Sequence, residues 1–218
     1  MRKIQFVNGE FYHIYNRGVD KRNIFNNSYD IQRFLQSMNE FNTINPIGSL
    51  YESSFLSPEI KSKRKRKKLV NFIAYCLNPN HYHFILEQLT NNGISQFMHR
   101  LGGGYSWQFN KKYQRSGSLF QGTFKAKLIY SNEYLLHLSA YVNLNYKVHK
   151  LGGLAAKLIK SSWAEYSTDQ ISGICEKSII LNQFKSDKEY KAFALDTLPT
   201  LIERKEQNKE LAELLFES

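Results

Sequence analysis

Two histidines flank a tyrosine in the segment His81-Tyr82-His83, and they are the first side chains that could act together. Alternate side chains of a β-strand point to the same face, so on a strand the two imidazoles would lie roughly 7 Å apart. Two imidazoles at this spacing can bind one divalent cation if other segments supply further ligands. The same pattern also arises from two ordinary histidines, or from zinc ligands in unrelated folds. The motif alone therefore leaves the kind of site open.

A stripe of polar residues farther along the chain offers the missing groups. His137, Tyr141, Asn145 and His149 recur every four residues, which predicts that they share one face of a helix. An apolar stripe beside them would let this helix pack on a sheet. If the helix meets the histidine pair, Asn145 can offer its carbonyl oxygen to a cation, and Tyr141 can reach a phosphate bound to that cation. The alternative is that Tyr141 is a packed tyrosine with its hydroxyl at the surface.

The elements that must position these residues follow from turn signals and apolar periodicity. The turn Asn78-Pro79-Asn80 lies between two short apolar segments, which predicts a hairpin whose second strand carries both histidines. A kink or a close contact is expected at Gly102-Gly103-Gly104, inside a helix. The expected order is a strand over 10–16, a helix over 30–41, strands over 69–77 and 81–87, a helix over 94–109, a strand within 117–130 and a helix from 132 to about 150.

This βαββαβα order predicts an α+β fold of the ferredoxin-like kind, in which helices cover one face of an antiparallel sheet and leave the other face open. We expect residues 1–150 to form that domain. The composition changes after Gly152-Gly153, so residues 151–218 are expected to form a C-terminal helical extension.

Charge is unevenly distributed along the 218 residues, whose net charge is +11. Residues 1–150 hold 21 Lys and Arg against 8 Asp and Glu, or +13, while residues 151–218 hold 9 against 11, or −2. A basic excess confined to one region favours a polyanionic partner, with nucleic acid as the first candidate. A solvated basic surface is the alternative. Seven of the eight residues 61–68 are basic, which predicts a loop that is either a solvated tail or a phosphate contact.

Other sequence features narrow the class of protein. Cys76 and Cys175 lie far apart with no Cys-x-x-Cys pairing, which argues against a disulfide framework, a structural zinc site or a redox motif. No apolar run reaches the ~18 residues of a membrane-spanning helix, and the first residues lack the apolar region of a signal peptide. We therefore expect a cytoplasmic protein. The chain also has no glycine-rich phosphate loop.

Taken together, these segments resemble the single-tyrosine HUH transposases, and in particular the branch of REP-associated tyrosine transposases. The combination of Asn80-His81-Tyr82-His83 with Tyr141 and Asn145 on a later helix is the most specific part of the resemblance. It covers about residues 10–150, with a weaker echo at Trp163 to Ser167. The other matching segments are Tyr12 to Gly18, Ile24-Phe25, Phe34-Leu35, Ala74 to Leu86, Gly117 to Lys125, and Tyr134 to Asn145.

The resemblance implies a ferredoxin-like enzyme that cuts and rejoins single-stranded DNA at hairpin-forming sequences, with DNA as its partner and a homodimer as one form of assembly. It implies that His81 and His83 bind a divalent metal, Mg²⁺ or Mn²⁺, with Asn145 as the third protein ligand. Tyr141 would be the nucleophile and would form a covalent 5′-phosphotyrosine. That bond conserves energy, so rejoining would need no ATP.

Six basic residues are further expected to contact DNA, each with a solvated position as the alternative. They are Arg17, Lys111, Lys112, Arg115, Lys125 and Lys127. The sequence departs from the family's usual pattern at Thr123, where a basic residue is common, and at Asn143 and Tyr146, which replace a His and a Pro. None of these three positions is assigned to the chemistry.

Two other functions fit the same residues. A non-catalytic, domesticated nucleic-acid-binding protein would keep the fold and the basic surface, with Tyr141 as a structural residue. Metal-dependent cleavage separates it from a transposase. A hydrolase with zinc on His81 and His83 would act on a small molecule, and it would leave the +13 charge of residues 1–150 unexplained.

Overall fold

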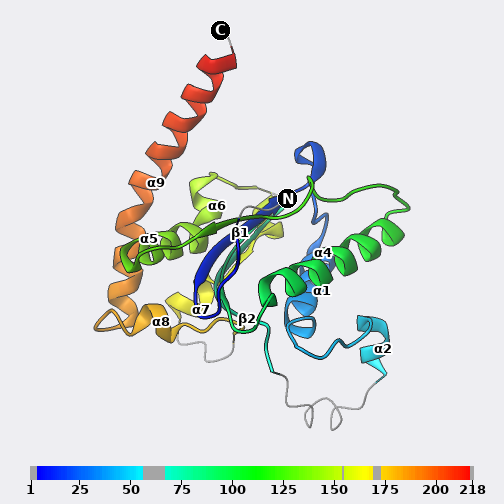
Figure 1. The fold of residues 1–218 in the computed structure, drawn as a ribbon. Coiled ribbons are helices and arrows are strands. Elements are labelled where there is room, and N and C mark those ends of the chain that lie inside the picture. Colours follow the sequence, from blue (N-terminus) through cyan, green and yellow to red (C-terminus); the bar gives the residue numbers. More distant parts are fainter. Residues whose placement is uncertain (1–3, 56–66, 154, 169–172, 217–218) are drawn as a thin grey trace.

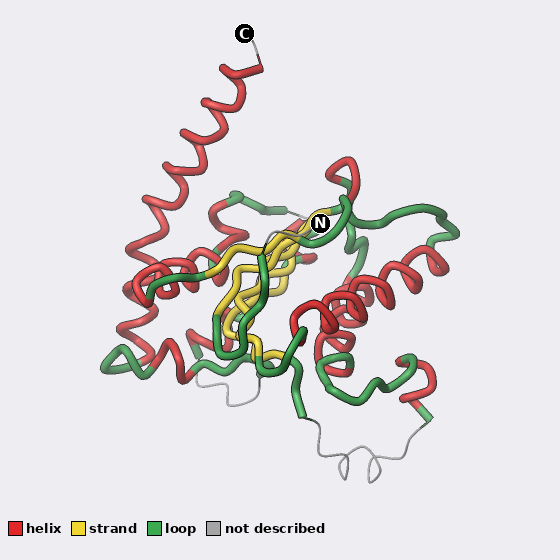
Figure 2. The backbone as a smooth tube through the Cα atoms, in the orientation of Figure 1, coloured by secondary structure: helices red, strands yellow, loops and turns green. Residues whose placement is uncertain are grey.

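The structure is a computed structural model that describes residues 4–55, 67–153, 155–168 and 173–216. A twisted sheet lies in the centre with helices on either side, and a long C-terminal helix extends beyond the rest of the molecule (Figure 1). The strands lie together between the two groups of helices, with loops at both ends of the sheet (Figure 2).

In the part of the chain that the structure describes, five strands form one sheet, and every neighbouring pair is antiparallel. The strands are β1 (Phe11–Arg17), β2 (Val70–Asn78), β3 (His81–Gln88), β4 (Lys125–Leu128) and β5 (Lys160–Ser161). Their order is β4-β1-β3-β2-β5, so β1 and β3 are neighbours although β2 lies between them in sequence. This crossover belongs to the ferredoxin-like arrangement. The α+β class and the antiparallel sheet expected from the sequence are confirmed.

Helices join and flank these strands in the expected order. The longer helices are α1 (Ser28–Glu40), α4 (Gly93–Lys112), α5 (Asn132–Asn143) and α9 (Asp187–Phe216). The shorter ones are η1 (Val19–Lys21), α2 (Leu50–Ser54), α6 (Asn145–Val148), η2 (Ala155–Leu158), α7 (Trp163–Ser167) and α8 (Ser178–Leu181). Within the described part of the chain, no helix combines the length and apolarity needed to cross a membrane.

Helices cover both faces of the sheet, which corrects the expectation that one face stays open. α1 and α4 pack on the face where Phe72 and Phe84 are buried. α5 packs on the opposite face, where Ile73 and Ile85 are buried, and α9 packs against α5. β2 and β3 are apolar on both faces, so both faces must be covered to remove their side chains from water.

The glycine run inside α4 allows a close approach between two elements. A side-chain carbon at Gly104 would lie 2.9 Å from the ring of Phe41, which follows the end of α1. That distance is shorter than van der Waals contact, so any other residue there would force the Phe41 ring to shift. The close contact expected at Gly102-Gly103-Gly104 is thus present at the last of the three glycines.

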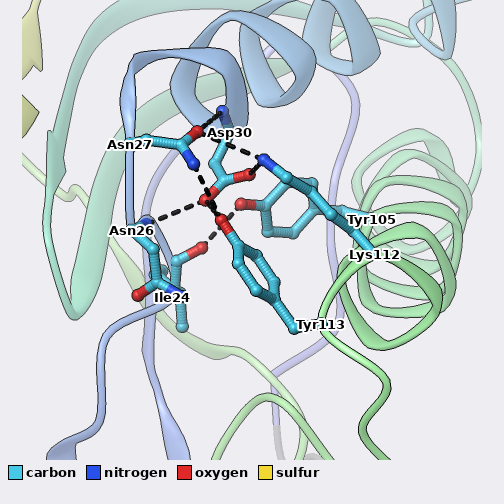
Figure 3. Close-up of polar contacts among 7 residues, drawn as sticks. All are labelled: Ile24, Asn26, Asn27, Asp30, Tyr105, Lys112 and Tyr113. Carbon is cyan, nitrogen blue, oxygen red and sulfur yellow. Dashed lines mark hydrogen bonds and ion pairs between the residues drawn. The ribbon is translucent and has the colours of Figure 1, made fainter.

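A buried carboxylate links the start of α1 to the end of α4 (Figure 3). Asp30 is fully buried, and its Oδ1 accepts a hydrogen bond from Lys112 Nζ at 2.6 Å. Its Oδ2 accepts one from the Tyr113 hydroxyl at 2.7 Å and one from the Asn26 backbone N–H at 2.8 Å. Because three donors surround one charge, the carboxylate fixes the two helices relative to each other.

The C-terminal segment shares a core with the preceding residues and also extends the sheet. Ser161 of β5 pairs with Cys76 of β2. The hydroxyl of Tyr190 in α9 is fully buried, lies 3.0 Å from Ser139 Oγ, and accepts a hydrogen bond from Asn143 Nδ2 at 2.8 Å. The segment is mostly helical, as expected, and closes the α5 face of the molecule.

Candidate active site

A pocket of about 490 Å³ opens where β1 ends and β3 begins. Strands β1, β3 and β4, helix α5 and the residues after α6 all contribute to it, so distant segments of the chain meet there. We call it the histidine pocket. It is lined by Tyr15, Asn16, Arg17, Lys21, Asn80, His81, His83, Gln121, Lys125, Tyr141, His149 and Leu151.

The hairpin between β2 and β3 directs His81 and His83 into this pocket, as strand alternation predicts. Their ring centroids lie 5.2 Å apart and the ring planes are nearly perpendicular. His81 Nδ1 is 2.6 Å from Asn80 Oδ1, so Nδ1 carries the proton and donates to that oxygen. The lone pair of His81 is therefore on Nε2, which lies 3.2 Å from Asn145 Oδ1.

Asn145 is fully buried at the start of α6, and the side chain of Asn78 holds it in place. Asn78 Nδ2 donates to Asn145 Oδ1 at 2.7 Å and lies 2.9 Å from His81 Nε2. The acceptor atoms of Asn145 and His81 thus converge on one point, where the amide of Asn78 satisfies both. The sequence pattern does not single out Asn78, because its role depends on a contact between the end of β2 and the start of α6.

Burial keeps the pocket histidines neutral. It lowers the pKa of His81, and it lowers the pKa of His83 well below the usual value for histidine. Burial, together with the nearby His81, also lowers the pKa of His149 to about 4. A neutral imidazole has one nitrogen with a free lone pair, which is the form that binds a metal.

His13 also belongs to the site, although the sequence pattern does not single it out. Its Nε2 lies 2.9 Å from His83 Nδ1, and both rings are buried. Burial and the nearby Lys127 lower the pKa of His13 to about 4, so one proton is shared between two neutral rings. When His83 Nδ1 donates that proton to His13, the lone pair of His83 is on Nε2. The sequence gives little indication of this role, because His13 and His83 become neighbours only when β1 pairs with β3.

Tyr141 projects from α5 toward the same histidines. Its ring centroid lies 5.6 Å from that of His83 and 6.3 Å from that of His13. Burial raises the pKa of the Tyr141 hydroxyl, while the nearby amide of Asn145 favours the phenolate and opposes this rise. The hydroxyl is therefore protonated at neutral pH, and reaction at its oxygen requires groups that stabilise the phenolate.

The helix that carries Tyr141 ends earlier than the sequence indicates. α5 stops at Asn143, and Leu144, with φ −105° and ψ 11°, separates it from α6. The predicted stripe is consequently divided: His137 contacts α9, whereas His149 lies 4.9 Å from His81 between ring centroids. At the break, the buried side chain of Asn143 bonds to Tyr190 and Ser162 of the C-terminal segment, which holds the last turn of α5 in place.

The expected DNA-contacting residues fall into two groups. Arg17 and Lys125 line the histidine pocket, and Lys127 lies on the same face of β4, opposite His13. The other group is at the end of α4 and does not line the pocket; it comprises Lys111, Lys112 and Arg115. Lys112 forms an ion pair with Asp30 at 2.6 Å, so its charge is already matched. Of the basic run 61–68, residues 61–66 lie outside the described residues.

The donor atoms of the pocket fit a divalent cation. Neighbouring ligands of a six-coordinate ion of the size of Mg²⁺ lie about 3 Å apart, and His81 Nε2 and Asn145 Oδ1 are separated by 3.2 Å. A cation between them would require the Asn78 amide to turn aside. Among the described residues no group of three His, Cys, Asp or Glu has metal-binding spacing.

The chain is similar to known DNA transposases in sequence profile and in fold. Residues 54–145 match the sequence profile of the IS200-like transposase family, and this range contains both histidines of the pair, Tyr141 and Asn145. A solved structure of a REP-associated tyrosine transposase bound to a REP hairpin is similar over 80% of this chain and 88% of that chain, with a TM-score of 0.53 and 15% identity. The resemblance inferred from the sequence motifs is confirmed. No curated protein matches the chain.

Proposed function

From this likeness to the IS200-like transposases, we propose that the protein is a metal-dependent DNA strand transferase and endonuclease. It cleaves and rejoins single-stranded DNA through a 5′-phosphotyrosine, at hairpin-forming sequences. The observation that carries the proposal is the meeting of Tyr141, His81 and His83 in one open pocket, with the buried amide of Asn145 directly behind His81. A structural tyrosine would need no such neighbours.

In the proposed reaction, the Tyr141 hydroxyl oxygen attacks the phosphorus of one phosphodiester. A bond forms between this oxygen and phosphorus, and the bond from phosphorus to the 3′ oxygen breaks. The phenol releases a proton, and the new 3′-hydroxyl takes one up, so the step balances. One phosphate ester replaces another, and attack by a 3′-hydroxyl on the phosphotyrosine rejoins the strand without an external energy source.

His81, His83 and Asn145 are the residues that would hold Mg²⁺ or Mn²⁺. When bound, the ion withdraws charge from the phosphate and stabilises negative charge that develops in the transition state. The chain itself keeps the imidazoles neutral through burial and orients His83 through His13. It also places the Asn145 amide where it favours the Tyr141 phenolate.

The lining of the histidine pocket suits a phosphodiester as substrate. It contains the basic residues Arg17, Lys21 and Lys125, and among its described residues there is no carboxylate to repel a phosphate. The REP hairpin bound by the structural relative supports a hairpin-forming DNA as the substrate.

A denaturing gel tests the proposal, with purified protein, Mn²⁺ or Mg²⁺, and 3′-end-labelled single strands from the flanks of the protein's own gene. We expect a covalent adduct that requires the metal and disappears in Tyr141→Phe and His81→Ala. Tyr146→Phe is the matched control, since Tyr146 is a half-buried tyrosine just after Asn145 that does not line the pocket. Tight DNA binding without an adduct in any condition would favour a non-catalytic binding protein instead.

A further inference from the structure

Outside the histidine pocket, two tyrosines form an exposed stacked pair where the chain passes from β4 into α5. The ring of Tyr130 is stacked on that of Tyr134, with centroids 5.4 Å apart and an interplanar angle of 23°. Tyr130 is 80% exposed. One face of the Tyr130 ring therefore lies on Tyr134, and its high exposure leaves the rest of the ring available to a further flat ring.

Two lysines of β4 lead from the histidine pocket toward this pair, with Lys125 at the rim of the pocket and Lys127 beyond it. Lys125 and Lys127 of β4 are exposed, and they lie opposite Tyr15 and His13 of β1 in the strand pairing. Directly opposite residues of antiparallel strands share a face, so both lysines extend over the face that carries the histidines. Neither lysine forms an ion pair with another described residue. Their charges are thus available to an anionic partner.

Aromatic rings continue from the pair toward the reacting groups. Tyr134 and Tyr141 are two turns apart on α5, which corresponds to a rise of about 10.5 Å along one side of the helix. Tyr15 lines the histidine pocket and stacks on His83, with centroids 5.7 Å apart. Burial raises the pKa of Tyr134, and the nearby hydroxyls of Tyr130 and Tyr15 add to that rise.

The distribution of charge also indicates on which side of the tyrosine pair a polyanionic partner would lie. The groove between the pair and α9 contains two carboxylates, Glu133 and Asp196, against one cation, Arg204, so its described charges sum to −1 and do not favour phosphates. The β4 side contains Lys125 and Lys127 instead. A partner that combines flat rings with regularly spaced negative charge fits this surface, and an unpaired nucleic-acid strand has both features.

We propose that Tyr130 and Tyr134 form a stacking platform for an unpaired base of the DNA, while Lys125 and Lys127 contact the phosphates between that base and the histidine pocket. The proposal rests on the proposed function in one respect, namely that the strand in the pocket is DNA. It requires no cleavage. The platform extends the DNA-contacting surface beyond the residues that react, and it holds the strand on one side of the scissile phosphate.

The test uses the full chain without added metal and a set of single-stranded oligonucleotides, each with one 2-aminopurine at a different position around the cleavage site. We expect one position to be quenched by the wild-type protein, because that base stacks on the platform. Tyr130→Ala should abolish this quenching and weaken binding by about tenfold, within the range for loss of one stacked base. Tyr130→Trp should retain both, since any aromatic ring can stack.

Tyr51→Ala is the matched control, because Tyr51 is also a surface tyrosine, 71% exposed, on α2 and therefore away from the histidine pocket. It should leave quenching and affinity unchanged. Equal affinity and quenching in Tyr130→Ala and wild type would overturn the platform while leaving the proposed reaction intact. Quenching that depends on Tyr130, without any covalent adduct in the presence of metal, would support the platform and contradict only the catalytic claim.

Discussion

At the scale of single residues, the placement of protons decides which ring nitrogens of the histidine pocket have a free lone pair. His83 has two ring nitrogens. One of them, Nδ1, is engaged by His13 Nε2 at 2.9 Å. Partners of this kind fix the tautomer and orientation of a metal-binding imidazole. We therefore expect His13 to influence binding of the proposed cation, although it is not itself among the proposed ligands.

We predict that His13→Ala lowers the affinity of the protein for Mn²⁺ by about 10- to 100-fold, the usual effect of losing such a partner. His13→Gln should restore most of it, because the Gln carbonyl can accept the proton of His83 Nδ1. Titration calorimetry measures the affinity, and ¹⁵N chemical shifts of the His83 ring report its tautomer. His99→Ala, at an exposed histidine of α4, is the control. Equal Mn²⁺ affinity in His13→Ala and wild type would contradict this role.

At the scale of elements, the sheet can position the pocket only if the helices packed on it keep a fixed position relative to each other. Asp30 is the main polar link between α1 and α4, since three donors surround its buried carboxylate (Figure 3). Removal of the carboxylate would leave those donors without their acceptor, which costs more than the loss of an exposed contact.

We predict that Asp30→Ala lowers the free energy of unfolding by about 2–3 kcal/mol, as measured by urea denaturation. Glu206→Ala removes a carboxylate from an ion pair with Lys150 whose two side chains are both more than half exposed. Its unfolding should match that of the wild type. A similar small change in both variants would show that the Asp30 cluster does not hold the helices.

The sequence predicts some of these elements because their signals are local. The turn at Asn78-Pro79-Asn80 and the alternation in His81-Tyr82-His83 are enough to place two imidazoles on one face of a strand. The break between α5 and α6 could not be predicted in this way. At the break, the hydrogen-bond partners of Asn143 are on segments that follow much later in the chain.

The sequence does not predict that α5 covers the second face of the sheet, or that His13 contacts His83, because both depend on long-range contacts. Apolar residues on both faces of β2 and β3 indicate burial, but they do not say which helix covers which face. His13 becomes a partner of His83 only through the pairing of β1 with β3, a contact between strands separated by a helix and a hairpin. Such long-range contacts are invisible to periodicity within a single segment.

At the scale of the whole molecule, the C-terminal segment completes the core on the α5 side. Tyr166, Ile180, Tyr190 and Ala194 are each fully buried there. We predict that a chain ending at residue 150 has a lower melting temperature than the full chain and binds a dye for exposed apolar surface, because this face is uncovered. A chain ending at residue 207, which retains these four residues, is the control. Equal melting temperatures for the full chain and the 150-residue form would show that the first domain is complete alone.

The uneven charge of the molecule leads to a second prediction at this scale, which concerns the salt dependence of DNA binding. If Lys125 and Lys127 each contact a phosphate of single-stranded DNA, replacing both with Ala should reduce the slope of log K against log salt concentration by about 1.4, at about 0.7 per contact. The double variant Lys188→Ala/Lys191→Ala, at exposed positions on α9, removes the same charge elsewhere. Fluorescence anisotropy at several salt concentrations measures both slopes. Equal slopes in the two double variants would contradict a local contact at β4.

Identification of the residue that becomes attached to DNA tests the central claim most directly. The protein is incubated with Mn²⁺ and single-stranded DNA from its own gene flanks, the DNA is digested with nuclease, and the peptides are examined by mass spectrometry. We predict a nucleotide joined through its 5′ phosphate to Tyr141, and none at that position in the sample without metal. A nucleotide on another tyrosine such as Tyr15, or an unmodified Tyr141 in a protein that still cuts DNA, would contradict this account.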